Sequence, residues 1–141
     1  MKSVFPRRLT LGQLPTPLHR LYRAENRWGK GHRLWIKRDD LTGCLLTGNK
    51  VRKLEFIAAH ALDNEFDTLL TCGAVQSNHC RATALVGAQL GLAVHLVLAG
   101  QSEDRPKGNL LLNQLSGAKI SYYEKSEYKK NLDSILLEWE E

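Results

Sequence analysis

Apolar residues recur at helical spacing in several stretches of this chain. Between positions 49 and 63 they fall three and four residues apart, which places them on one face of a helix. The same spacing predicts helices over residues 77–90, 106–116 and 127–141, and a shorter helix over 18–26. Gly91 and Gly117 follow two of these stretches directly and suit the left-handed position that ends many helices.

Short apolar runs between the helices predict β-strands over residues 68–72, 93–98 and 119–123. A further strand is expected over 32–38, where larger apolar and polar residues alternate. Because strands and helices alternate from residue 68 onward, the order predicts a parallel sheet with right-handed crossovers and helices on its faces. The predicted fold class is α/β, a three-layer α/β/α arrangement with a mainly parallel sheet.

The last predicted helix ends unusually. Glu138, Glu140 and Glu141 stand at the negative end of the helix dipole, and no glycine, proline or basic residue marks a stop. This ending favours a chain that is interrupted inside or just after a helix. A frayed natural terminus fits the same residues.

Composition limits the classes of partner. The 141 residues include 20 basic and 15 acidic side chains, and the net charge of +5 is dispersed rather than gathered in a block. Nucleic acid is therefore not expected as a partner. No window approaches the roughly 18 apolar residues of a membrane span, and the first residues lack the apolar core of a signal peptide. We expect a cytosolic protein with no membrane partner.

The three cysteines, Cys44, Cys72 and Cys80, form no CxxC pair, so free thiols are expected rather than disulfides or a zinc site. His79 and Cys80 are neighbours, but adjacent helical residues point about 100° apart and no further metal ligands lie nearby in the sequence. We expect no metal, and a packed thiol at Cys80.

Three cations crowd the start of the helix predicted over 49–63, at Lys50, Arg52 and Lys53. Positive charge is unfavourable there, because the free amide groups of a helix N-terminus already carry partial positive charge. Long cationic side chains can simply extend into water. Alternatively, crowding favours the neutral form of the Lys50 amine, which is the form that attacks a carbonyl group.

The second candidate locus follows the strand over 68–72 and reads Gly73-Ala74-Val75-Gln76-Ser77-Asn78-His79. In an open parallel sheet, ligands bind beyond the carboxyl ends of strands. The free amides at the start of the next helix can receive a carboxylate or phosphate group. Ser77 or Asn78 alone could be an ordinary helix cap, but four successive hydrogen-bonding side chains exceed what one cap needs.

Three motifs together resemble one enzyme family. Residues 35–40 (WIKRDD), 48–56 (GNKVRKLEF) and 73–79 (GAVQSNH) look like those of D-cysteine desulfhydrase and 1-aminocyclopropane-1-carboxylate deaminase. These are pyridoxal phosphate enzymes of the tryptophan synthase β-like fold, or fold type II. The resemblance implies that Lys50 anchors the cofactor covalently and that Asn78 bonds its ring oxygen. Asn49 and Lys53 would assist cofactor binding, with Ser77 contacting substrate near the reacting carbon and Gln76, Asn78 and His79 helping to bind it.

The implied reaction converts D-cysteine to pyruvate, sulfide and ammonia, or 1-aminocyclopropane-1-carboxylate to 2-oxobutanoate and ammonia. His79 favours the desulfhydrase, because deaminases often carry glutamine there, whereas Thr47 and Ala82 depart from the common pattern. The alternatives are a cysteine synthase-like or threonine dehydratase-like enzyme and a non-catalytic remnant domain.

Enzymes of this family are roughly twice as long. By the resemblance, residues 1–48 begin the large cofactor domain and residues 49–141 form the small domain. The loop that holds the cofactor phosphate and the partner of its pyridine nitrogen come from the second half of such enzymes. We therefore expect an N-terminal portion that binds cofactor weakly and turns over poorly alone, and a homodimer when the protein is full length.

Overall fold

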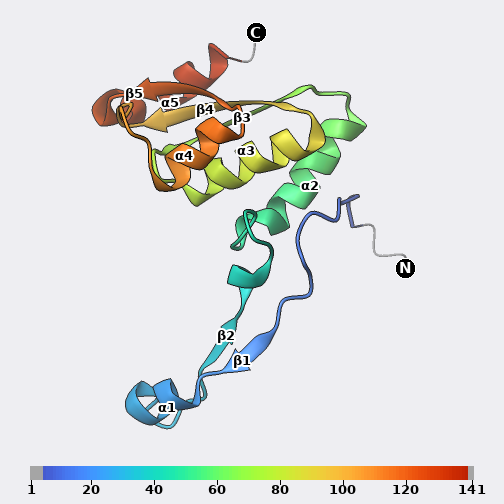
Figure 1. Ribbon diagram of the computed structural model, residues 1–141, viewed down its shortest axis with the longest axis vertical. Helices are drawn as coiled ribbons and strands as arrows, with labels where there is room; N and C mark the ends of the chain where they lie inside the picture. Colours follow the sequence, from blue (N-terminus) through green and yellow to red (C-terminus); the bar gives the residue numbers. More distant parts are fainter. Residues whose placement is uncertain (1–4, 140–141) are drawn as a thin grey trace.

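The computed structural model describes residues 5–139 and has two parts, an α/β body and a narrow arm that projects from it (Figure 1). The body begins with α2 (Lys50–Asp63) and contains the sheet and the remaining helices. The arm consists of β1 (Leu18–Arg20), α1 (Tyr22–Trp28) and β2 (Trp35–Lys37). A single 3-10 turn, η1 (Asp39–Leu41), leads from the arm toward α2.

The sheet of the body is parallel, with strand order β3-β4-β5. Its strands are β3 (Thr68–Ala74), β4 (Ala93–Ala99) and β5 (Lys119–Tyr123). The connections run through α3 (Asn78–Leu90) and α4 (Gly108–Leu115). Gly91 ends α3 in the left-handed conformation at φ 73°, and Gly117 follows α4 at φ 78°. The predicted α/β fold and the glycine stops are confirmed.

Alternate side chains of β4 face different layers. Val94, Leu96 and Leu98 belong to the core cluster that also contains residues of α3 and α4. His95, on the opposite face, packs edge-on against Trp139, just after α5 (Lys125–Leu137), with ring centroids 4.1 Å apart. Helices therefore cover both faces of the sheet, as the sequence predicts.

The helix α2 lies beside α3 and joins the body to the N-terminal segment (Figure 1). Leu54 and Ala58 of α2 pack with two residues of α3, and Leu9 and Leu11 cover them. Glu55 is buried, and its Oε1 accepts hydrogen bonds from the backbone amides of Leu11 at 3.0 Å and Gly12 at 3.1 Å. The chain before the arm is thus fastened to the helix that Lys50 begins.

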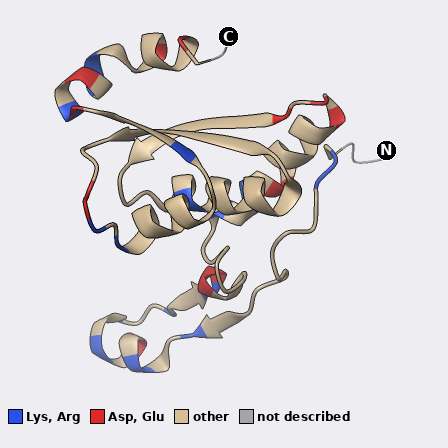
Figure 2. Ribbon diagram, turned by 45° about the horizontal axis from the view of Figure 1, so that its top comes forward, with Lys and Arg blue, Asp and Glu red and all other residues tan. Residues whose placement is uncertain are grey.

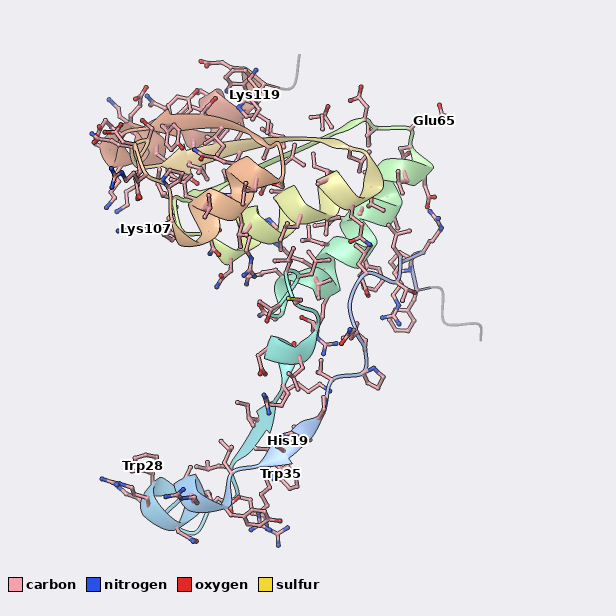
Figure 3. The ribbon with its side chains drawn as sticks, in the orientation of Figure 1. His19, Trp28, Trp35, Glu65, Lys107 and Lys119 are labelled. Atoms are coloured by element: carbon pink, nitrogen blue, oxygen red, sulfur yellow. The ribbon has the colours of Figure 1, made fainter. Side chains whose placement is uncertain are left out.

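The arm corrects one prediction, because residues 18–20 form a strand rather than the start of a helix. β1 pairs antiparallel with β2, Leu18 opposite Lys37, and α1 begins only at Tyr22. Among described residues 5–48, no apolar side chain is buried, glycine apart. Trp28 and Trp35 instead project from the arm (Figure 3) and are 66% and 53% exposed.

Other differences concern the ends of elements. β2 covers only residues 35–37 of the strand predicted over 32–38, and α4 covers 108–115 of the helix predicted over 106–116. α5 ends at Leu137 instead of continuing to 141, and Glu140 and Glu141 lie outside the described residues. No helix of the described residues is long and apolar enough to cross a membrane.

Lys and Arg residues are scattered over the arm and the helices of the body (Figure 2). The cysteines are free thiols, with Cys44 exposed and Cys80 buried. Burial raises the pKa of the Cys80 thiol, in agreement with the packed thiol that the sequence predicts. Within residues 5–139, no group of three or more histidine, cysteine or acidic side chains is arranged to hold a metal ion.

Candidate active site

Lys50 lines a cavity of about 440 Å³, which lies where the start of α2, the loop before it and the first turn of α3 meet. Its walls include Thr47, Gly48, Asn49 and Lys50 from the loop and α2, with Asn78 and Arg81 from α3; Ile36, Lys37, Asp39 and Asp40 complete the lining. Three larger cavities, beside α1, between β3 and α5, and along residues 13–17, contain none of the predicted site residues.

The loop before Lys50 is held by a charged network centred on Asp39. The Asp39 carboxylate accepts hydrogen bonds from Arg52 Nε at 2.8 Å and Nη2 at 2.7 Å, and from the Thr16 hydroxyl at 2.7 Å. These donors, the Arg52 guanidinium first, hold the pKa of Asp39 well below its usual range. Arg52 is therefore committed to an ion pair rather than free to bind an anion.

Backbone contacts complete the loop. The Gly48 amide donates to the Asp39 carbonyl oxygen at 2.7 Å. The fully buried Thr42 hydroxyl lies 3.0 Å from that same oxygen and within reach of two further carbonyls, those of Leu46 and Gly48. Gly48 has φ 100°, a conformation that a side chain would strain. The chain can therefore turn sharply just before Asn49 and present Lys50 at the head of α2.

Lys50 is half-buried, and no carboxylate pairs with it in the part of the chain that the structure describes. The cations gathered at the head of α2 have different surroundings, since Arg52 is paired while Lys53 is exposed. An unpaired primary amine that faces a cavity is available to a ligand carbonyl.

The second predicted locus is the turn from β3 to α3. Ser77 is the N-cap of α3, and its hydroxyl accepts a hydrogen bond from the Cys80 amide at 3.2 Å. A Cβ at Gly73 would lie 2.8 Å from Cys80 Sγ and 2.9 Å from Ser77 Oγ, so this close approach requires glycine. The turn places Asn78, the first residue of α3, at the cavity with Lys50.

Gln76 and Ser77 do not line this cavity. The side chain of Gln76 turns instead toward the start of α4, where its Nε2 donates to the Lys107 carbonyl at 3.1 Å and its Oε1 accepts from the Asn109 amide at 2.9 Å. Ser77 is occupied in capping α3. Of the two interpretations of Ser77 from the sequence, the contact in the structure is that of a helix cap.

His79 faces a smaller pocket between α2, β3 and α3, of about 100 Å³, together with Leu54 and Thr83. Its Nδ1 is buried and has no hydrogen-bond partner. Burial, followed by the positive charges of Lys53 and Lys50, lowers the pKa of His79. The lowered pKa favours the neutral form of the histidine.

The structure adds Arg81 to the site. Arg81 is 8% exposed, donates from Nη2 to the Thr47 carbonyl at 2.7 Å, and lines the cavity with Lys50. Its Nε is buried without a hydrogen-bond partner. A cavity with an amine, a side-chain amide and a guanidinium fits a small anion that bears a carbonyl group, and pyridoxal phosphate is of that kind.

Of the predicted site residues, Asn49, Lys50 and Asn78 meet at the cavity, whereas Lys53, Gln76, Ser77 and His79 do not line it. Sequence reasoning missed two contributors, Asp39 and Arg81. Asp39 could have been found from its position in the Asp39-Asp40 pair, directly after two basic residues. Arg81 could have been found because it is a lone charge on a helix face whose other residues are small and apolar.

Residues 9–137 match the sequence model of a protein family that is described as "Pyridoxal-phosphate dependent enzyme". The chain belongs to this family. The cofactor of this family is pyridoxal phosphate, as the resemblance in the sequence implies.

Two relatives carry the names that the motifs suggest. The chain is 46% identical over 129 residues to a bifunctional D-cysteine desulfhydrase/1-aminocyclopropane-1-carboxylate deaminase of Arabidopsis thaliana, covering 84% of this chain and 30% of that protein. It is 45% identical to a D-cysteine desulfhydrase of Klebsiella pneumoniae, covering 82% of this chain and 36% of the relative. The chain therefore spans about a third of the length of these pyridoxal phosphate enzymes.

Solved structures confirm fold type II. The crystal structure of an ACC deaminase homologue superposes with a TM-score of 0.79 at 38% identity, over 97% of this chain and 42% of that one. A fungal L-serine ammonia-lyase from Rhizomucor miehei matches with a TM-score of 0.64 at 16% identity, which supports the fold alone.

Proposed function

We propose that this chain supplies the lysine-bearing part of a pyridoxal phosphate-dependent deaminase or lyase that acts on a small amino acid. The observation that carries the proposal is the meeting of Lys50, Asn78 and Arg81 at one cavity. The names of the relatives support D-cysteine or 1-aminocyclopropane-1-carboxylate as the substrate. Each reaction consumes one water: D-cysteine gives pyruvate, sulfide and ammonia, and the cyclic amino acid gives 2-oxobutanoate and ammonia.

Each side chain has a definite task in this proposal. The Lys50 amine would hold the cofactor covalently at the cofactor's aldehyde carbon, with loss of water, and when free the same amine would hold and move a proton at Nζ. Asn78 would donate to the ring oxygen of the cofactor, and the free amides at the start of α3 would receive the substrate carboxylate. The bound cofactor supplies the electron sink for breaking a bond at the substrate.

The assignments of Asn49, Lys53, Gln76, Ser77 and His79 are part of the same proposal. Asn49 borders the cavity, and Lys53 adds positive charge that acts on His79. The Ser77 hydroxyl accepts from the Cys80 amide and still has its own proton to donate to a substrate. Gln76 acts through its backbone and through the shape of the turn, because its side chain is bound to the start of α4.

Trapping of the cofactor on Lys50 tests the proposal. The chain is mixed with pyridoxal phosphate, reduced with borohydride, digested and mapped by mass spectrometry. We expect the modification on the peptide that contains Lys50 and its loss in Lys50→Arg. Lys129→Arg, the same change on exposed α5, is the matched control and keeps the adduct. Absence of any adduct at Lys50, even when the remaining length of a relative is supplied as a second polypeptide, favours a non-catalytic remnant domain.

We further propose that the arm, within residues 1–48, belongs to the larger cofactor domain of such an enzyme, and that residues 49–141 form the smaller domain. The support is the absence of buried apolar side chains from described residues 5–48, since a segment that exposes Leu18, Trp28 and Trp35 needs a further surface to cover them. Amide hydrogen exchange tests this: the arm should exchange quickly in the isolated chain and slow down when the rest of a relative is added.

Three finer points belong to the proposal. Alone, the chain binds cofactor weakly and turns over slowly. The complete enzyme is a homodimer of cytosolic location that uses no nucleic acid. Comparison of sulfide release from D-cysteine with 2-oxobutanoate formation decides between the two substrates, and the desulfhydrase is expected from His79. Turnover of neither substrate by the completed enzyme, with the Lys50 adduct intact, favours a cysteine synthase-like or threonine dehydratase-like activity.

A further inference from the structure

A second asparagine, Asn109, lies next to Asn78 without lining the cavity itself. Asn109 is the second residue of α4. Its side-chain Nδ2 lies 2.8 Å from the carbonyl oxygen of Gln76 and 3.0 Å from Oδ1 of Asn78. One side chain of α4 therefore contacts both the turn after β3 and the asparagine that borders Lys50.

Backbone groups determine which end of each side-chain amide faces its neighbour. The carbonyl oxygen of Gln76 can only accept, so the atom of Asn109 that faces it is the nitrogen. The same nitrogen faces Asn78, whose oxygen must then be the acceptor. The Nδ2 of Asn78 is left to donate elsewhere, and Asn78 lines the cavity with Lys50.

The side chain of Gln76 is oriented in the same way. The Asn109 amide can only donate and lies 2.9 Å from Gln76 Oε1, while the Lys107 carbonyl can only accept and lies 3.1 Å from Nε2. Gly108 permits this approach, since a Cβ there would lie 2.7 Å from Gln76 Oε1 and its φ is 57°. The turn after β3 is thus clamped to the start of α4 by four hydrogen bonds.

We infer that Asn109 is a positioning residue, which holds the Asn78 side chain with its nitrogen directed at the cavity beside Lys50. The inference rests on the proposed function, because a donor at this place suits the ionised ring oxygen of pyridoxal phosphate. With Asn78 turned over, its carbonyl oxygen would meet that oxygen and repel it. Asn109 therefore sets the polarity of the site without touching the cofactor.

Two substitutions test the orientation. Asn109→Asp removes both side-chain donors, so Asn78 turns its nitrogen toward position 109 and its oxygen toward the cavity. Asn109→Ala removes the contact and leaves Asn78 free to rotate. Because one hydrogen bond to an ionised group is lost, we expect about tenfold weaker binding of pyridoxal phosphate in both variants, measured by equilibrium dialysis. Asn131→Asp, the same change at an exposed position of α5, is the control and binds as the unmodified chain does.

Nuclear magnetic resonance of the cofactor-free chain supplies a second readout. The two side-chain amide protons of Asn78 should give slowly reorienting signals in the unmodified chain. In both Asn109 variants these signals shift, and in Asn109→Ala they also sharpen because Asn78 is free to rotate, while the backbone signals of β4 and the thermal midpoint stay the same. Unchanged Asn78 side-chain signals overturn the inference. So does a loss of binding accompanied by general destabilisation, since a purely structural role would give that result.

The two readouts separate this inference from the proposed function. If the unmodified chain forms no adduct at Lys50, the proposed function fails, and the Asn78 signals in the variants still decide whether Asn109 sets the orientation. If the adduct forms and cofactor binding is equal in Asn109→Asp and the Asn131→Asp control, the proposed function stands and the role of Asn109 is wrong.

Discussion

Replacement of Glu55 by alanine should destabilise the chain more than any exposed acidic substitution. Glu55 Oε1 accepts from the Leu11 and Gly12 amides, and Oε2 lies 3.6 Å from Arg8 Nη1. A hydrogen bond to a charged group contributes about 1.5–3 kcal/mol. Water can reach the half-exposed Leu11 after the substitution, but the buried Gly12 amide keeps no acceptor. We expect a loss of about 3 kcal/mol in the free energy of unfolding.

Glu55→Gln separates the acceptor from the charge. Its side-chain oxygen can still accept from both amides, so only the charge and the contact with Arg8 are lost. We expect this variant to cost about 1 kcal/mol. Urea unfolding followed by circular dichroism measures the free energy of unfolding of the unmodified chain, Glu55→Ala and Glu55→Gln. Glu103→Ala, in an exposed loop, is the control. If Glu55→Gln costs as much as Glu55→Ala, the charge matters and the acceptor argument is wrong.

Three further outcomes are expected. The pKa of Asp39 is lowered, so its stabilising contribution is complete above the unfolded-state pKa of about 3.9 and declines as pH falls below it; the stability difference between Asp39→Asn and the unmodified chain should shrink on acidification. Gly73→Ala places a Cβ 2.8 Å from Cys80 Sγ and should lower the thermal midpoint. Arg81→Met loses the bond to the Thr47 carbonyl, so that hydrogen exchange in the loop before α2 accelerates.

Each outcome has a matched comparison. Asp133→Asn, on exposed α5, should show no change of its stability effect with pH over the same range; equal behaviour of the two asparagine variants contradicts the Asp39 network. Gly31→Ala adds a Cβ with nothing within 4 Å at φ 87°, so it introduces backbone strain without crowding; a drop in the midpoint for Gly73→Ala no larger than for Gly31→Ala contradicts the crowding at Gly73. Unchanged exchange in Arg81→Met means that the loop is held by Thr42 and Asp39 alone.

The elements of the body could be predicted because their signals are local. The spacing of apolar residues in α2 and α3 and the glycines after α3 and α4 depend on neighbours within a few positions. The strand β1 could not be predicted in the same way. Residues 18–20 are extended because they pair with residues 35–37, and a local pattern contains no trace of that partner.

The site was predicted only in part for a related reason. The motifs identify Lys50 and Asn78, but the side chains of a motif can face either the cavity or the protein. Gln76 turns to α4 because Gly108 leaves room for it, a condition found 32 positions further along the chain. Arg81 was missed because helical spacing assigns it a place on α3 and gives no information on the loop that it contacts.

The attachment of the N-terminal segment to α2 also bears on the order of folding. Thr16 meets Arg52 across 36 positions and Leu11 meets Glu55 across 44, whereas α3 and α4 connect strands that are close in the sequence. Closing long loops costs entropy before any contact repays it, so the parallel sheet should assemble before these distant contacts form. The N-terminal end of α2 would then acquire its final environment in one of the last steps, and an incompletely folded chain would have a sheet but no organised place for Lys50.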